Sequence, residues 1–389
     1  MRARRICLLT ALTFVAVCCT PAGGPAPVAP PPPPPAGWSG PGPVPPPRRM
    51  RLFFGGDVMQ HMPQVDAVRR GDGFDYKPVF RTLAPRIRAA DLAVVNLETT
   101  LTRRSRYTGY PLFRSPAALA DALRDAGVDV AVLANNHICD RGAEGIRSTL
   151  AALDEAGLLH TGAFADSVPP RERHPLMLEK EAFRVALLNY TYGTNGLPVP
   201  SGCRVNGIDT VAIRREIALA RQDGATHVAL FVHWGNEYER LPGPRQRELA
   251  AAFHRWGADL VIGSHPHVVQ PAETIEDSAG NVRGATVYSM GNFVSNQRFP
   301  DTDGGLSVRV TLTLDEQGRT SCLPEYLIVW TCISRDPNSA SGRRYDIVPS
   351  YSRETVAPEH RDAFDRFVER TRRHMERHGR GFTEIRCDY

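Results

Sequence analysis

Short apolar runs alternate with helical patterns through most of the chain, and this alternation constrains the fold more than any other feature. Strand-like runs cover residues 51–56, 92–97, 129–134, 183–190, 226–232, 259–263, 285–290, 306–314 and 325–333. Helical patterns cover residues 78–90, 115–127, 143–157, 209–224 and 244–257. This order predicts βα units, in which helices cover a largely parallel sheet. The last strands follow one another without helices, which predicts an antiparallel finish to the sheet.

The chain after residue 335 has a different pattern. Residues 358–378 carry apolar side chains at positions 364, 367, 368 and 375, which form one stripe on a helix. We therefore predict one α/β domain over residues 49–335 and a C-terminal extension over residues 336–389, whose amphipathic helix packs on the domain.

The first 48 residues are not expected to belong to the fold. Residues 1–19 combine a basic start, MRARR, with a short apolar run, which is typical of a signal peptide. Cys18 or Cys19 is the candidate lipid acceptor of a lipoprotein, and an ordinary cleaved signal or an uncleaved anchor is the alternative. Residues 20–48 are rich in Pro and Gly and predict an extended stalk. We expect an exported protein of the cell envelope, either anchored in the membrane or periplasmic.

Charge and cysteine content exclude some classes. The net charge is +5, and Arg2, Arg4 and Arg5 supply three of these charges before any acidic residue. A nucleic-acid partner is not expected, because such a domain carries a concentrated basic face. Five cysteines follow the stalk, at positions 139, 203, 322, 332 and 387, and their spacing predicts neither a zinc site nor a particular disulfide.

Polar residues follow six of the predicted strands at the point where each strand ends. They are Asp57; Glu98; Asn135, Asn136 and His137 with Asp140 behind them; His233 with Glu237 behind it; Ser264, His265 and His267; and Asn292. Ligands of open α/β sheets bind outside the carboxyl ends of the strands, so we expect these side chains at one edge. Carboxylate, amide and imidazole ligands together suit Mn, Fe or Zn, and carboxylates can bridge two ions. The sequence therefore predicts a site for one or two divalent ions.

The segment VIGSHPHVV, residues 261–269, contains the most distinctive pair. In extended backbone, alternate side chains share one side, so His265 and His267 would project together. Pro266 biases the preceding residue away from helix. Taken alone, the pair is more often a polar turn, just as Asp57 or Glu98 alone suits a helix cap. Their joint occurrence at strand ends favours the metal site.

Six segments also form an ordered set of motifs. They are GGDVM (55–59), NLETTLT (96–102), ANNHICDRG (134–142), HWGNEYE (233–239), GSHPHVVQPAE (263–273) and YSMGNFVSNQ (288–297). Over about residues 50–335 the chain resembles the bacterial capsule-synthesis protein CapA family, which includes the CapA/PgsA-type proteins of poly-γ-glutamate capsule systems. That family is similar to calcineurin-like metallophosphoesterases. The resemblance implies a four-layered α/β/β/α sandwich of metallo-dependent phosphatase type with a C-terminal helical appendage, and a two-metal centre.

Carried over by position, the resemblance also implies roles. The metal ligands would be Asp57, Glu98, Asn136, His233, His265 and His267. His137 would be the general acid, oriented by Asp140, and Glu237 would support the ligands or contact substrate. Met59 stands where the phosphoesterase motif usually has a histidine, so one ion and two ions remain alternatives. His61 is the candidate replacement ligand.

Together these features predict a capsule or poly-γ-glutamate biosynthesis protein with a metal-dependent hydrolase site, for phosphoesters or for γ-glutamyl amides. The alternative is a non-catalytic capsule assembly or export partner that retains the fold. The expected partners are an anionic or γ-glutamyl polymer and the membrane proteins of capsule synthesis.

Overall fold

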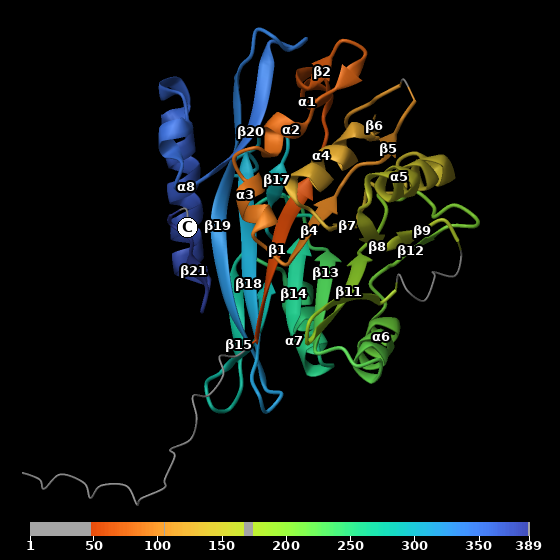
Figure 1. Cartoon of the computed structure of the whole chain (residues 1–389), viewed down its shortest axis with the longest axis vertical. Helices are drawn as coiled ribbons and strands as arrows, with labels where there is room; N and C mark the ends of the chain where they lie inside the picture. Colours follow the sequence, from red (N-terminus) through yellow and green to blue (C-terminus); the bar gives the residue numbers. More distant parts are fainter. Residues whose placement is uncertain (1–47, 105, 167–173, 388–389) are drawn as a thin grey trace, which may run out of the picture. The chain divides into compact units, whose positions relative to one another are not determined.

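The structure is a computed structural model that describes residues 48–104, 106–166 and 174–387 (Figure 1). The predicted signal peptide and the predicted stalk up to residue 47 lie outside the described residues. Within the described ranges, no helix is long and apolar enough to cross a membrane.

The first large sheet has nine strands and is built around β1 (Arg48–Val58). On one side β1 pairs in parallel with β4 (Leu92–Leu97), and on the other it pairs antiparallel with β18 (Gly304–Leu314). The remaining strands are β7 (Val130–Val132), β8 (Leu159–Thr161), β17 (Asn292–Val294), β19 (Thr320–Arg335), β20 (Arg343–Pro349) and β21 (Thr383–Glu384). The order β20-β19-β18-β1-β4-β7-β8 joins a parallel half to an antiparallel half. The predicted antiparallel finish is confirmed.

The second large sheet has six strands in the order β10-β11-β13-β14-β16-β15. They are β10 (Leu176–Lys180), β11 (Phe183–Thr191), β13 (His227–His233), β14 (Leu260–Ser264), β15 (Ala272–Glu276) and β16 (Val282–Val287). Its four inner strands, β11, β13, β14 and β16, are all parallel, so the carboxyl ends of β11, β13 and β14 meet at one edge.

Three apolar layers hold four layers of backbone together. Leu52 and Phe54 of β1 point into a core shared with Phe231 and Ile262, so the two sheets pack face to face. The opposite face of the first sheet lies under α2 (Lys77–Phe80), α3 (Ala84–Arg88), α4 (Ala118–Ala126) and α5 (Gly142–Ala156). The outer face of the second sheet lies under α6 (Thr210–Gln222) and α7 (Pro244–Arg255). The α/β/β/α sandwich is therefore confirmed.

The predicted C-terminal helix is α8 (Pro358–His378), which lies along β19 (Figure 1). Its stripe of Phe364, Phe367, Val368 and Met375 is buried in the core that the two sheets share. β20 and α8 both lie beyond residue 335 and pack on the first sheet. The proposed domain bounds stay predictions.

The remaining short elements complete the chain: α1 (Met62–Ala67), a 3-10 turn (Arg353–Thr355), and three two-residue pairings of β2 (Arg69–Arg70) with β3 (Gly73–Phe74), β5 (Leu101–Thr102) with β6 (Ser115–Pro116), and β9 (Ala163–Phe164) with β12 (Arg204–Val205).

Two expected elements are divided in the structure. The helix expected over 78–90 is two short helices, because Pro85 lies in the first turn of α3 and cannot donate a hydrogen bond within a continuous helix. The strand expected over 285–290 ends at Val287, and the chain then turns at Gly291 into β17, which joins the other sheet. Gly291 has a φ of +70°, and its carbonyl approaches so closely that a Cβ on Gly56 would lie 2.1 Å from it. This crossing brings the two sheets together at the candidate site.

Candidate metal centre

The carboxyl ends of strands from both sheets meet at one buried edge. Asp57 of β1 lies opposite Asn96 of β4 and Asn292 of β17, and His233 of β13 lies opposite Ser264 of β14. All six predicted ligands are buried: Asp57, Glu98, Asn136, His233, His265 and His267. The structure therefore brings the whole predicted ligand set into one region.

The two carboxylates share one amide donor. The side-chain nitrogen of Asn96 donates to Oδ1 of Asp57 at 2.8 Å and to Oε2 of Glu98 at 3.2 Å. The other oxygen of Asp57 lies 3.1 Å from Nδ1 of His267. Oε1 of Glu98 lies 3.6 Å from Nε2 of His233 and 3.8 Å from Nε2 of His267. Glu98 thus stands between histidines from two different strand ends.

His233 is held on both sides of its ring. Its Nδ1 lies 2.9 Å from the hydroxyl of Ser264, and its Nε2 lies 2.9 Å from Oδ1 of Asn136. The amide nitrogen of Asn136 donates to Asn195 at 3.2 Å, which fixes the Oδ1 toward His233. The imidazole nitrogen of His233 and the amide oxygen of Asn136, which come from opposite sheets, therefore lie in direct contact.

Two buried ligand atoms lack a hydrogen-bond partner among the described residues, and this tests whether a cation fits. They are Oε1 of Glu98 and Nδ1 of His265. Three groups of side chains have ligand atoms within 4.8 Å of one another: Glu98, His233 and His265; Asp57, Glu98 and His267; Glu237, His265 and His267. A buried polar atom without a partner costs free energy, and a cation would satisfy both atoms. The residues present fit a divalent metal ion.

Burial and mutual repulsion also set the protonation states. Burial, and next the neighbouring Asp57, raise the pKa of Glu98 well above its ordinary value. Burial, and then the neighbouring histidines, lower the pKa of His233 well below its ordinary value and that of His265 to about 3. Both imidazoles are therefore neutral near pH 7, and a neutral imidazole is the form that binds a metal.

The backbone of the histidine pair differs from the expectation. His265 and His267 have φ angles of 100° and 59°, so the prediction of extended backbone here is wrong. Their rings nevertheless lie 6.0 Å apart, because a turn around Pro266 directs both toward Asp57 and Glu98. Non-glycine residues adopt this region at a cost of about 1–3 kcal/mol, and such residues cluster at functional sites.

His137 and Asp140 form a second pair in the loop after β7. Nδ1 of His137 lies 2.8 Å from Oδ2 of Asp140, and the same oxygen accepts a hydrogen bond from the backbone N–H of Phe113 at 2.7 Å. The Phe113 ring packs edge-on against the imidazole at 4.6 Å between centroids. Asp140 and Phe113 therefore fix the ring and leave its Nε2 as the nitrogen available for proton transfer.

His61 belongs to none of the three ligand groups found among the described residues, and Met59 has no ligand atom of the type that defines them. Met59 is buried, and its sulfur accepts from the hydroxyl of Ser295 at 3.8 Å. His61 precedes α1, where its Nδ1 lies 3.3 Å from the side chain of Gln64, and its ring packs against Phe113. The geometry gives His61 a local structural role.

Three residues of the site region were not predicted. Tyr192 packs on His265 with ring centroids 4.5 Å apart, and Tyr238 lies 6.3 Å from His267. Asn189 accepts from the backbone N–H groups of Leu133 and Ala134, just before the Asn135–His137 loop. Tyr192 directly follows β11, so the rule that identified the other strand ends would have found it, whereas Asn189 lies inside that strand. Glu237 is exposed beside Tyr238, at the mouth of the site.

The comparison with known proteins matches the part of the chain that contains the six motifs. The model of the family "Bacterial capsule synthesis protein PGA_cap" matches residues 51–297. The chain belongs to this family. It is 30% identical over 277 residues to a capsule biosynthesis protein CapA of Bacillus anthracis, covering 68% of this chain and 64% of that protein. It is 28% identical to a PGA biosynthesis protein CapA of Bacillus subtilis, covering 70% of each. The match thus spans less than two thirds of the first of these relatives.

A shorter match, 29% identical over 198 residues, relates 48% of the chain to 52% of a probable polyglutamine synthesis accessory protein of Mycobacterium tuberculosis. Among solved structures, a 5'-nucleotidase from Candida albicans aligns with 84% of this chain and 58% of its own, at 11% identity and a TM-score of 0.36. A purple acid phosphatase from yellow lupin aligns with 71% of this chain and 53% of its own, at 10% identity and a TM-score of 0.31.

Proposed function

We propose that this protein is a metal-dependent hydrolase of the cell envelope that acts on an anionic capsule-type polymer, at phosphoester or γ-glutamyl amide bonds. One observation carries the proposal: two buried ligand atoms without a hydrogen-bond partner among the described residues, on Glu98 and His265, lie within a histidine and carboxylate cluster. The family and its capsule biosynthesis relatives are the reason for proposing a capsule-type polymer as the substrate. The predicted signal peptide is the reason for proposing the cell envelope as the location.

Each group of side chains has a separate task in this proposal. Asp57, Glu98, Asn136, His233, His265 and His267 would hold one or two ions of Mn, Fe or Zn. A bound ion supplies Lewis-acid activation of water and of the phosphoryl or acyl oxygen. His137 donates a proton from Nε2 to the leaving group, because Asp140 holds its other nitrogen. Glu237, exposed at the mouth, contacts the substrate.

A non-catalytic role in capsule assembly or export, with capsule-synthesis membrane proteins as partners, is the second candidate. Two observations favour it. Met59 occupies a position where the resemblance expects a histidine ligand, and one relative is named an accessory protein. In that role the ion would be structural, and His137 would have no chemical task.

Metal analysis combined with hydrolysis assays tests the proposal. We expect the purified protein to bind at least one equivalent of Mn, Fe or Zn, and to hydrolyse bis-p-nitrophenyl phosphate or γ-glutamyl-p-nitroanilide. His265→Ala should lose both metal and activity. His137→Gln and Asp140→Asn should keep the metal while kcat falls by about 10²–10⁴-fold for His137→Gln and less for Asp140→Asn.

His360→Gln on α8 is the matched control and should change neither metal content nor activity. A metal-loaded protein that cleaves neither substrate favours the assembly role. Activity that survives unchanged in His265→Ala would contradict the proposed site.

A further inference from the structure

A groove rich in arginine runs along α8 toward the candidate metal centre. It consists of two hollows of about 590 Å³ and 290 Å³, which share Arg370 in their lining. The arginines that line them are Arg240, Arg298, Arg366, Arg370, Arg373 and Arg377. The three carboxylates in the lining are Asp301, Asp303 and Glu376. Positive charge therefore exceeds negative charge along the groove, which favours an anionic ligand.

The groove begins at the mouth of the metal centre. Tyr238 lies 6.3 Å from His267 on one side and 4.9 Å from Phe299 on the other, measured between ring centroids. Phe299 lines the smaller hollow beside Arg298, and Arg240 lines the larger one two residues after Tyr238. The two aromatic rings thus lie between the histidine cluster and the arginines.

Some arginines of this groove are held by an ion pair, and others are available to bind a ligand. The buried carboxylate of Asp301 lies 3.3 Å from Arg240 and 2.8 Å from Arg370, so one negative charge serves two guanidinium groups. Among the described residues, no carboxylate forms an ion pair with Arg366 or Arg377. These two side chains and the excess charge around Asp301 are available to a ligand.

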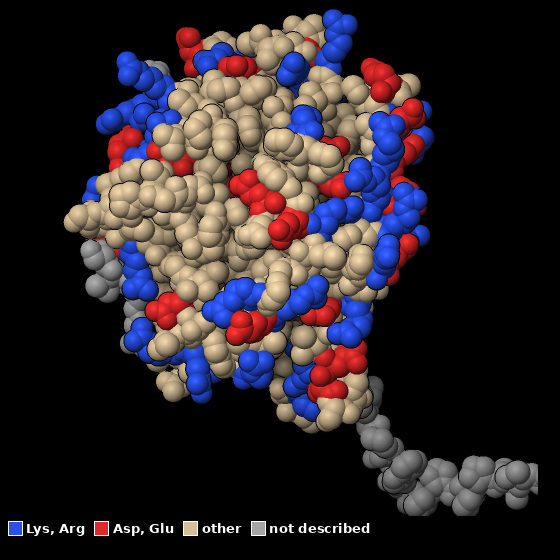
Figure 2. Space-filling view, turned by 180° about the vertical axis from the view of Figure 1, so that it is seen from behind, with Lys and Arg blue, Asp and Glu red and all other residues tan. Residues whose placement is uncertain are grey.

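An anionic membrane surface is the other class of partner for a basic helix, and the packing of α8 argues against it. A helix that binds a membrane surface buries its apolar face among the lipids. The apolar face of α8 is already buried against β19, through Phe364, Phe367 and Met375. Figure 2 shows a band of basic side chains, interspersed with acidic ones, along the edge that α8 forms, and basic side chains extend from it toward the middle of that face. Such a band suits an extended chain with repeated negative charges.

We propose that this groove binds an extended anionic polymer and leads it past Tyr238 and Phe299 to the metal centre. The inference rests on the proposed function, because it names how the polymer substrate of that site is recognised. Arg366 and Arg377 contact successive anionic groups, while Arg240 and Arg370 form a pre-positioned pair between them and the site. Arg366 and Arg377 lie on α8, beyond residues 51–297 that the family model matches, so their part of this recognition belongs to the C-terminal extension.

A binding assay with a matched pair of double variants tests the groove. Fluorescently labelled poly-γ-glutamate is titrated into wild-type protein, into Arg366→Gln/Arg377→Gln, and into Arg214→Gln/Arg215→Gln. The second pair consists of exposed arginines on α6, far from α8 in Figure 1, and removes the same charge. We expect the α8 variant to bind about tenfold more weakly and the α6 variant to bind like the wild type. Equal unfolding midpoints establish that both variants are folded.

Further measurements identify which anionic ligand is recognised. They also distinguish failure of the groove proposal from failure of the hydrolase proposal. Polyphosphate that competes with poly-γ-glutamate shows that repeated charge is recognised; binding of poly-γ-glutamate alone would also support the groove and identify carboxylates. Equal weakening in both variants overturns the groove, as does α8-dependent binding to phosphatidylglycerol vesicles without polymer binding. If the wild type hydrolyses neither small substrate while the α8 variant still loses polymer binding, the hydrolase proposal fails and the groove stands.

Discussion

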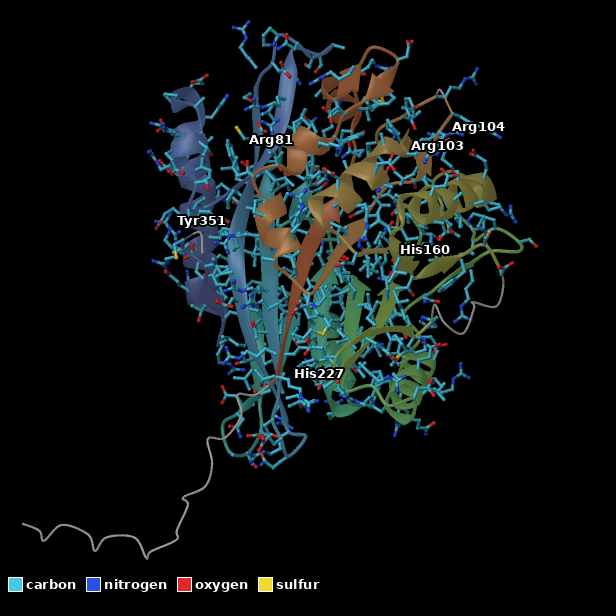
Figure 3. All side chains as sticks on the ribbon, in the orientation of Figure 1. Arg81, Arg103, Arg104, His160, His227 and Tyr351 are labelled. Carbon is cyan, nitrogen blue, oxygen red and sulfur yellow. The ribbon has the colours of Figure 1, made fainter. Side chains whose placement is uncertain are left out.

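At the scale of single residues, burial determines which histidines stay neutral, and β13 illustrates it at both ends. His233 lies at the carboxyl end, in the candidate metal centre, and His227, which Figure 3 labels, lies at the amino end. Burial, and next the charges of Arg221 and Arg283, lower the pKa of His227 from 6.5 to about 4. Its Nε2 has no hydrogen-bond partner among the described residues. The same physical cause therefore keeps a candidate ligand neutral at one end of the strand and has a cost in stability at the other.

His227 should make the protein sensitive to mild acid. Between pH 6.5 and about 4 the unfolded chain protonates this histidine while the folded protein does not, so the unfolded state binds more protons. The free energy of unfolding should rise with pH across this window, and His227 alone contributes up to about 3 kcal/mol of the change. We expect His227→Phe to flatten this dependence, measured by urea unfolding at several pH values.

Phe183→Leu is the control for this measurement, because Phe183 packs against His227 at 5.8 Å and carries no titratable group. It should lower stability by a similar amount at every pH. An unchanged pH dependence in His227→Phe would show that His227 does not carry the effect.

At the scale of elements, the site depends on how strand ends from two sheets are held together. Asn189 of β11 accepts hydrogen bonds from the backbone of Leu133 and Ala134, at 3.0 Å and 2.6 Å, and donates to the carbonyl of Phe231 at 3.0 Å. It therefore ties the end of β7, in the first sheet, to β11 and β13 in the second. This tie sets the position of Asn136 relative to His233.

Asn189→Leu should lower both stability and metal affinity. The substitution removes the side-chain partner of three buried backbone groups, of which the N–H of Leu133 keeps a second acceptor in the carbonyl of Thr161, and this costs about 1–3 kcal/mol in the free energy of unfolding. The Asn136 loop also loses its anchor, so metal affinity should fall. Leu188→Ala is the control: it removes a buried side chain of the same strand, costs about as much stability, and should keep its metal affinity. Equal metal affinity in both variants would refute the positioning role of Asn189.

The strand ends were predictable and the connections between them were not. Asp57, Glu98 and His233 each follow a continuous apolar run, and parallel strands place such ends at one edge, so local pattern sufficed. Asn189 lies inside an apolar strand, and its partners are more than 50 residues away in the sequence. The turn at His265 and His267 also escaped prediction, because its partners are distant in the sequence: the backbone N–H of Tyr238 donates to the carbonyl of Pro266, and Asp57 contacts His267.

At the scale of the whole molecule, the candidate ligands join the two sheets of the sandwich. Asp57 and Glu98 come from the ends of β1 and β4 in the first sheet, and His233, His265 and His267 follow β13 and β14 in the second. A cation at this edge would replace repulsion between buried carboxylates by attraction across the interface. Metal binding should therefore stabilise the packing of one sheet on the other, and not only a loop.

Removal of the metal should accordingly destabilise the whole domain. An ion that binds only the folded state, present at a hundred times its dissociation constant, adds about 2.7 kcal/mol to the free energy of unfolding. We expect the urea midpoint to fall on dialysis against a chelator and to recover with Mn, Fe or Zn. His265→Ala should lack this response, and His360→Gln should show it in full. A urea midpoint that does not change with metal in the wild type, or that changes equally in His265→Ala, would contradict this prediction. Only an ion bound between the two sheets makes their packing depend on His265.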